Sequence, residues 1–172
     1  HGGVLALAGD DHAGKSSTVA HQSEQAFQTS QFPVLHPAGI QDILDFGLIG
    51  FAMSRYTGCW VALKTTTEIA ESSAAVDVDP DRVAIVLPTD VEMPPGGLNI
   101  RWPDHWNDQE YRLHRYKIRA VLAFARANAI DRVVMDSPKA RFGIITTGKS
   151  YLDVRQALDD LGIDATVAER IG

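Results

Sequence analysis

A run of polar and charged residues that could bind a ligand follows the first apolar stretch of the chain. Gly9–Ser16 reads GDDHAGKS and satisfies the pattern G-x-x-x-x-G-K-S/T directly after the apolar Val4–Ala8. In a nucleotide-binding P-loop, backbone N–H groups and a lysine converge on the phosphates. Val133–Met135 is a second apolar run, and it ends in Asp136, which would serve as the carboxylate on the magnesium side. An ATP or GTP site is therefore one reading of this spacing.

The two adjacent carboxylates of this segment argue against bound phosphate. Asp10 and Asp11 would raise the energy of a polyanion held by the same loop. Asp136 also has a simpler role, since Asp-Ser-Pro commonly opens a turn. In parallel α/β sheets, ligands bind outside the carboxyl ends of the strands. The polar residues here either orient a substrate or cofactor, including coenzyme A, or cap turns and helices; they are Asp10, Asp11, His12, Lys15, Ser16 and Ser17.

The histidines and the cysteine limit the metal chemistry that is expected. His12, His21 and His36 are not spaced one helical turn apart, and no cysteine accompanies them, so no metal site is predicted. His21, Gln22 and Glu24 are expected to begin a helix rather than bind a ligand. Cys59 is the single cysteine and opens the apolar run CWVAL, which favours a buried thiol. One cysteine excludes an internal disulfide and an iron–sulfur cluster held by this chain alone, and it indicates a reducing compartment, the cytoplasm.

The composition narrows the class of partner. The chain has 172 residues, 45% of them hydrophobic, and a formal net charge of -6. An acidic surface does not neutralise a phosphate backbone, so nucleic acid is not expected as a partner. The concentrated basic stretch 112–119 has helical spacing and is expected to be a solvated helix face. No apolar run approaches the roughly 20 residues that a bilayer span needs, so no membrane contact is expected.

Short apolar runs alternate with amphipathic stretches along the chain. This pattern predicts an α/β fold with a parallel sheet flanked by helices. Strands are expected at Val4–Ala8, Pro33–His36, Trp60–Leu63, Val83–Leu87, Arg132–Met135 and Gly143–Thr146. Helices are expected within 18–30 and at Ile40–Tyr56, Asp108–Asn128 and Tyr151–Leu161, with Gly58 ending the second.

Two segments bear on domain organisation. Residues 88–108 contain four prolines and two tryptophans, which predicts a long irregular loop that is functional or lies at a contact surface. The turn DSPKAR (136–141) is the expected boundary between two lobes, 1–137 and 138–172.

Several ordered blocks of the sequence resemble one known family. They are GGVLALAGDDHAGKSSTVAHQSEQAF (2–27), PVLHPAGIQDILDFGLIGFAMSRYTGCWVALK (33–64), a TESSAAVDV-like segment that ends at Val78, and RVVMDSPKARFGIITTGKSYLDVRQALDDLGI (132–163). This series is similar to the indolepyruvate:ferredoxin oxidoreductases, which are thiamine-diphosphate-dependent 2-oxoacid:ferredoxin oxidoreductases. In that family the position of Gly14 need not be glycine, so the resemblance makes the P-loop match accidental.

The resemblance implies that the chain is an internal segment of a large enzyme. That enzyme would decarboxylate an aryl 2-oxoacid such as indole-3-pyruvate, pass the acyl group to coenzyme A and pass electrons to ferredoxin. Its cofactors would be thiamine diphosphate with magnesium, together with iron–sulfur clusters in other domains. Residues 1–137 would be the latter part of the domain that binds the cofactor's pyrimidine, and 138–172 the start of a transketolase C-terminal-like domain.

The resemblance also sets what the segment is expected to lack. The activating glutamate would lie upstream of His1, so the segment alone is expected to be inactive. Its partners would be the remaining domains of the enzyme and a second copy in a homo-oligomer. A further alternative is that the segment acts as an interaction module between domains.

Overall fold

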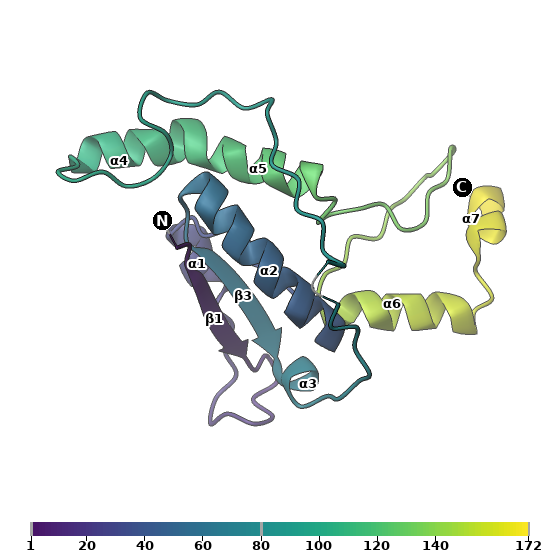
Figure 1. The fold of residues 1–172 in the computed structure, drawn as a ribbon. Helices are drawn as coiled ribbons and strands as arrows, with labels where there is room; N and C mark the ends of the chain where they lie inside the picture. Colours follow the sequence, from purple (N-terminus) through teal and green to yellow (C-terminus); the bar gives the residue numbers. More distant parts are fainter. Residues whose placement is uncertain (1, 80, 172) are drawn as a thin grey trace.

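The computed structural model describes residues 2–79 and 81–171 and contains a small open sheet flanked by helices (Figure 1). Its strands are β1 (Leu5–Asp10), β2 (Val34–Leu35) and β3 (Val61–Thr66). Their order is β1-β3-β2, and both pairings are parallel. The α/β class predicted from the alternating pattern is thereby confirmed.

The strand register brings the carboxyl ends of β1 and β3 together. Leu5 lies opposite Val61 at one end of the pair, and Asp10 lies opposite Thr66 at the other. Between them, Lys64 lies opposite Ala8. Parallel strands share one carboxyl edge, so the polar residues that follow β1 lie beside those that end β3.

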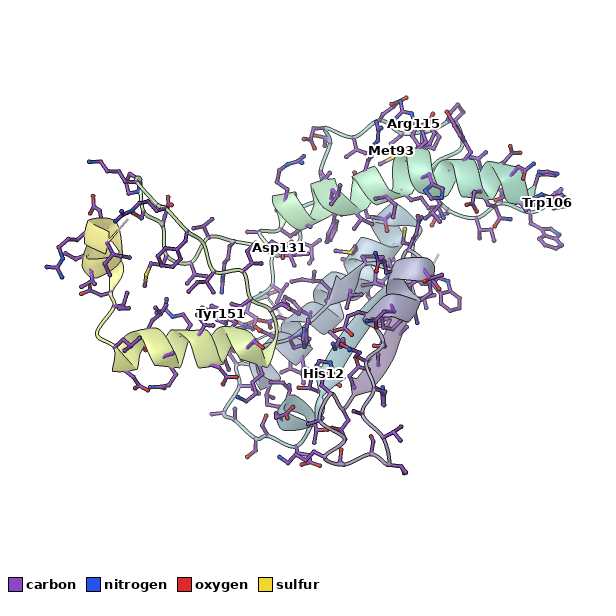
Figure 2. The ribbon with its side chains drawn as sticks, turned by 180° about the vertical axis from the view of Figure 1, so that it is seen from behind. His12, Met93, Trp106, Arg115, Asp131 and Tyr151 are labelled. Carbon is purple, nitrogen blue, oxygen red and sulfur yellow. The ribbon has the colours of Figure 1, made fainter. Side chains whose placement is uncertain are left out.

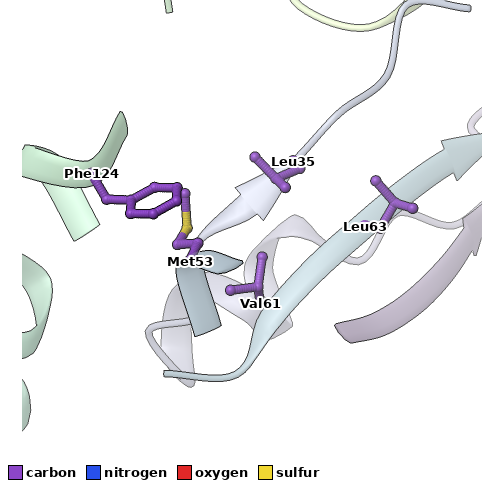
Figure 3. Close-up of a cluster of buried hydrophobic side chains, with 5 residues drawn as sticks. All are labelled: Leu35, Met53, Val61, Leu63 and Phe124. Carbon is purple, nitrogen blue, oxygen red and sulfur yellow. The ribbon is translucent and has the colours of Figure 1, made fainter. Parts of the chain in front are cut away.

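One long helix, α2 (Ile40–Thr57), covers one face of the sheet and matches the predicted helix closely. Gly50 allows this contact because a Cβ there would lie 2.6 Å from Leu5 Cδ1. Gly58 ends the helix in the left-handed conformation, with φ 68°, and its N–H donates to Ser54 O at 2.9 Å. The buried apolar cluster between sheet and helices is drawn in Figure 3 and comprises Leu35, Met53, Val61, Leu63 and Phe124.

Two short helices border the carboxyl edge of the sheet. They are α1 (Glu24–Thr29), which falls within the range expected for the first helix, and α3 (Thr67–Ala70), which follows β3 directly. The chain between β1 and α1 forms a loop rather than a helix start, so α1 begins only at Glu24.

A second long helical segment crosses α2 and supplies Phe124 to the core. It consists of α4 (Trp106–Arg112), a π-helical turn η1 (Leu113–Lys117) and α5 (Ile118–Ala127). It begins before the expected Asp108 because the His105 side chain accepts a hydrogen bond from Asn107 N–H at 3.3 Å and caps the helix. The preceding loop is irregular, as expected, and Trp106 lies exposed at the far end of α4 (Figure 2).

The expected strands at 83–87, 132–135 and 143–146 are wrong for the described residues. Val86 N–H and Val86 O pair instead with the Asn128 side chain, at 2.8 and 2.9 Å. In the other two segments, Val133 is 76% exposed and Ile145 fully exposed. An apolar run becomes a strand only where another strand completes its backbone hydrogen bonds, and none adjoins these segments in the described residues.

The end of the chain forms two helices on one side of the sheet, α6 (Lys149–Asp160) and α7 (Ala165–Ile171). α6 corresponds to the helix expected at Tyr151–Leu161, whereas α7 was not predicted. Gly148, with φ 59°, places its backbone against the ring of His36, where a Cβ would clash. Among the described residues, no helix combines the length and apolar character needed to cross a membrane.

Candidate functional site

Asp10 ends β1 as a buried carboxylate, only 2% exposed. Its Oδ2 accepts hydrogen bonds from Ser23 N–H at 3.0 Å and Ser23 Oγ at 2.9 Å, and it lies 3.2 Å from Lys64 Nζ. Burial by itself would raise the pKa of Asp10, but the Ser23 hydrogen bonds and the Lys64 ammonium outweigh it and lower the pKa. Asp10 is therefore held as a carboxylate.

Lys64 is the centre of a cluster that we call the Lys64 cluster: Asp10, His12, Glu24 and Lys64. The lysine comes from the middle of β3 and is 1% exposed. Its Nζ contacts Glu24 Oε1 and lies 2.9 Å from His12 Nε2 and 3.2 Å from Asp10 Oδ2. A buried ammonium is stable only when acceptors replace its water, and these side chains provide them.

Asp11 organises the loop that follows β1. Its Oδ1 accepts from Lys15 N–H at 2.8 Å, and its Oδ2 accepts from Ser16 N–H at 2.6 Å and Ser17 N–H at 2.7 Å. The hydrogen bond from Lys15 N–H, followed by those from Ser16 and Ser17, lowers the pKa of Asp11 far below its ordinary value. Ser16 Oγ also lies 3.0 Å from Thr67 Oγ1, which joins the loop to α3.

This geometry argues against the nucleotide-binding alternative. The amides that a P-loop directs at phosphate point here at the Asp11 carboxylate. Ser17 is followed by further loop, so no helix N-terminus supports the amides, and the strand expected before Asp136 does not form. The match to the P-loop pattern is one of sequence and not of structure.

His12 and His21 flank Asp10 on its two oxygens. His21 Nδ1 lies 3.5 Å from Asp10 Oδ1, and His12 Nε2 lies 3.9 Å from Asp10 Oδ2. Both imidazoles are about half exposed. His21 was expected only as a helix-start residue, but a hydrogen bond from its N–H to Asp11 O at 3.1 Å ties it to the site.

Three of these side chains also have the composition of a metal site. Asp10, His12 and Glu24 place one ligand atom each within 4.8 Å of one another. The Lys64 ammonium contacts all three of those atoms, so it occupies the place of a cation and would repel a second one. Lys64 thus supplies the positive charge that a bound metal ion would otherwise supply.

The half-buried His36 follows β2 and is within electrostatic reach of His12 and Asp10. Its burial, and then the neighbouring His12, lower the pKa of His36, while Asp10 acts in the opposite direction. The neutral form of His36 is therefore favoured.

The structure brings together Asp10, Asp11 and His12, and it places Lys15, Ser16 and Ser17 around the Asp11 carboxylate, with the Lys15 side chain exposed. Sequence reasoning missed Lys64 and the part played by Glu24. The available signal was a lysine directly after the apolar run Trp60–Leu63, because a charged residue that continues a buried strand needs partners. In Figure 2, His12 lies toward the lower end of the sheet region, far from Trp106.

Fold and site together define an open parallel α/β domain with a polar cluster at the carboxyl ends of its strands. Residues 132–172 match the family model described as the indolepyruvate oxidoreductase domain. No solved structure matches the chain.

Curated relatives named indolepyruvate oxidoreductase subunit IorA match nearly the whole chain. The protein of Methanothermobacter marburgensis is 24% identical over 165 residues, 96% of this chain and 26% of that protein. Those of Pyrococcus abyssi and Pyrococcus horikoshii are 25% and 26% identical over 179 residues, 100% of this chain and 27% of each protein. The chain therefore spans about a quarter of the length of these relatives. The resemblance to the indolepyruvate oxidoreductase family is confirmed.

Proposed function

We propose that this chain is a segment of an indolepyruvate oxidoreductase that oxidatively decarboxylates an aryl 2-oxoacid to an acyl-CoA, with ferredoxin as the electron acceptor. The observation that carries the proposal is the similarity of 96% or more of the chain to proteins that share one name, IorA. The substrate class and the acceptor follow from the family that the sequence resembles. Coenzyme A follows from the same source.

The geometry supports a ligand-facing role for the carboxyl edge of the sheet. The half-exposed imidazoles of His12 and His21 lie beside the buried Asp10, which pairs with the buried Lys64. Such a charged cluster is costly to bury, and groups of this kind are concentrated at functional sites. We assign Asp10, Asp11, His12, Lys15, Ser16 and Ser17 to a region near the substrate or cofactor.

The described residues do not fit the diphosphate of thiamine diphosphate. The amides of Lys15, Ser16 and Ser17 are occupied by Asp11, and Asp10 adds a second negative charge beside them. Cys59 is buried, and a single thiolate does not hold an iron–sulfur cluster. In this proposal, other parts of the enzyme hold thiamine diphosphate, magnesium and the clusters, and the activating glutamate lies outside the segment.

The domain assignment is part of the same proposal. Residues 1–137 are the latter part of the pyrimidine-binding-type domain, and 138–172 are the start of a transketolase C-terminal-like domain; His1, Pro80 and Gly172 lie outside the described residues. The enzyme would be a homo-oligomer. It would be cytoplasmic, in keeping with the free Cys59 of this segment.

The test is an assay of the full-length polypeptide that carries this segment, purified without oxygen. We expect indole-3-pyruvate to drive ferredoxin reduction that depends on coenzyme A and added thiamine diphosphate, with pyruvate and 2-oxoglutarate as comparison substrates. The 172-residue chain alone should be inactive. Turnover by the chain alone, or a full-length protein that reduces ferredoxin with none of these oxoacids, would refute the proposal.

A second role, as an interaction module for the other domains, is favoured by exposed apolar side chains around β1 and α2. Leu7 is 77% exposed on the edge strand, and Leu48 is 52% exposed on α2. If such side chains form a contiguous surface, that surface would face a partner. Light scattering of the isolated chain should show self-association, and a monodisperse monomer would count against this role.

A further inference from the structure

β1 has the composition of an interior strand, yet it lies at an edge of the sheet. The strand order β1-β3-β2 leaves one side of β1 open within residues 2–79 and 81–171, and Figure 1 shows the strand at the outer edge. Residues 5–9 include neither a charge nor a proline. Edge strands are usually blunted by charges, prolines or short length, whereas continuous apolar runs are typical of strands that are buried inside a parallel sheet.

The opposite edge of the same sheet is blunted in this way. β2 comprises only Val34 and Leu35, and prolines lie on either side of it, at Pro33 and Pro37. A strand of two residues between prolines offers little backbone to a further strand. The contrast between the two edges indicates that the sheet continues beyond β1 and not beyond β2.

The backbone of β1 alternates between a paired side and an open side. Val61 N–H donates to Val4 O at 3.1 Å, so the backbone of Val4 faces β3. Along a strand in a parallel pair, the backbone groups of alternate residues point to opposite sides. The residues of β1 whose N–H and C=O groups face away from β3 are therefore Leu5, Leu7 and Gly9. In the described part of the chain, no backbone group pairs with them.

Exposed apolar side chains border this open side. Leu5 and Leu7 project from the same face of β1, and Leu5 packs where a Cβ on Gly50 of α2 would lie 2.6 Å from it. Leu7 is 77% exposed. A Cβ on Gly3, just before β1, would lie 3.0 Å from Phe51 O, which brings that side of α2 to the strand. The exposed apolar residues of α2 at helical spacing from Phe51 are Leu44 and Leu48.

We propose that an extended segment of the same polypeptide, outside these 172 residues, pairs with β1 as a further strand and packs apolar side chains over Leu7. The partner must supply backbone donors and acceptors in alternation, which an extended strand has and a helix does not. The chain spans about a quarter of the length of its relatives, so most of the polypeptide is available to provide this strand. The inference rests on the chain being a segment of a longer enzyme, as proposed above, and not on the reaction.

The first test is hydrogen exchange of the full-length polypeptide, measured at single-residue resolution by mass spectrometry. We expect the amides of Leu5, Leu7 and Gly9 to exchange as slowly as those of Ala6 and Ala8, which face β3, to within about tenfold. At an open edge, the first three amides would exchange roughly a hundredfold faster than the other two, because nothing accepts their hydrogen bonds. That pattern would overturn the proposal.

A charge at the edge should remove this protection selectively. In the full-length Leu7→Asp variant, we expect exchange at Leu5 and Gly9 to become at least about tenfold faster, while the amides that face β3 change little. Leu161→Asp is the matched control, because Leu161 is 73% exposed after α6, and it should leave the exchange of β1 as in the wild type. Unchanged protection in Leu7→Asp would contradict a strand over Leu7. If the variant does not fold, the wild-type exchange pattern decides by itself.

Dilution distinguishes this partner from a second copy of the chain. A strand of the same polypeptide protects β1 at any protein concentration, whereas pairing between the β1 strands of two copies is lost when the oligomer dissociates. Protection that disappears as sedimentation shows dissociation would therefore overturn the proposal.

Turnover separates the inference from the proposed function. A full-length protein that turns over no 2-oxoacid but protects Leu5, Leu7 and Gly9 would refute the proposed reaction and support the strand pairing. An active enzyme with these three amides unprotected would do the reverse.

Discussion

Ser54 of α2 binds the backbone of Val4, just before β1. Its Oγ accepts from Val4 N–H at 2.8 Å and donates to Cys59 O, just before β3, at 2.6 Å. One buried hydroxyl thus joins a helix to the beginnings of two adjacent strands. Because these strands run in parallel, the same hydroxyl helps to set where their carboxyl ends meet, at Asp10 and Thr66.

Replacing this hydroxyl should destabilise the fold. Ser54→Ala leaves Val4 N–H and Cys59 O without their partner, and we expect the free energy of unfolding to fall by about 1–3 kcal/mol. Thr29→Ala is a control, because the Thr29 hydroxyl bonds Gln25 O on an exposed helix surface, and a change within about 0.5 kcal/mol is expected there. Urea titrations of both variants check this; equal losses would show that the buried hydroxyl has no special role.

Two glycines of α2 provide a matched pair for testing the packing of the sheet. Gly50→Ala places a methyl group 2.6 Å from Leu5 Cδ1 and 3.2 Å from Leu35 Cδ1, so we expect a loss of about 1–3 kcal/mol. Gly47 has open space in the same helix, and Gly47→Ala should stabilise by up to about 1 kcal/mol through helix propensity. Thermal unfolding of the two variants should therefore shift in opposite directions. A shift in the same direction would contradict the close approach of α2 to β1.

The loop after β1 should depend on the ionised form of Asp11. The pKa of Asp11 is lower in the folded chain than its ordinary value of 3.8, because Lys15 N–H, Ser16 N–H and Ser17 N–H donate to its carboxylate. Its contribution to stability is therefore complete above the unfolded value and is lost as the pH falls from there toward the folded value. Asp11→Asn should flatten the acid limb of the stability profile measured by urea titration from pH 6 to pH 2.

The control for this profile is Asp131→Asn, which changes an exposed carboxylate after α5. It should leave the acid limb as in the wild type. If Asp11→Asn also left it unchanged, the three amides would not be held by an ionised carboxylate.

The chain should not bind nucleoside triphosphates. Because Asp11 occupies the amides of 15–17, Mg-ATP and Mg-GTP should not shift the thermal unfolding of the chain, and Lys15→Ala should behave as the wild type does. A ligand at 100 times its dissociation constant would stabilise by about 2.7 kcal/mol, which such a titration detects readily. A clear shift that Lys15→Ala abolishes would restore the P-loop interpretation and contradict the loop geometry.

The elements that could be predicted from the sequence are those whose signals are local. Ile40–Tyr56 shows helical spacing and Gly58 stops it, so α2 was expected to within one residue at its end. The apolar runs at 4–8 and 60–63 became β1 and β3 because each found the other as a partner. The equally apolar run at 143–146 found none, and propensity alone cannot supply the missing hydrogen bonds.

Only the part of the site that follows β1 could be predicted from the sequence. Asp10 to Ser17 follow a strand and could be read as a polar cluster, but Lys64 and Glu24 reach it through the parallel register and the late start of α1. The strand register and the start of α1 depend on tertiary contacts, which no local sequence pattern encodes. A lysine inside a buried strand was the single local sign that a second strand contributes.

The hydrogen bonds that Asp11 makes to its own loop have a kinetic consequence. Lys15, Ser16 and Ser17 are already fixed in one backbone conformation, so this loop has little freedom left to lose when a ligand arrives. Association of a ligand at the carboxyl edge of the sheet would then require neither a closing lid nor a folding step. Its rate would be set by the encounter of the ligand with the half-exposed His12 side chain.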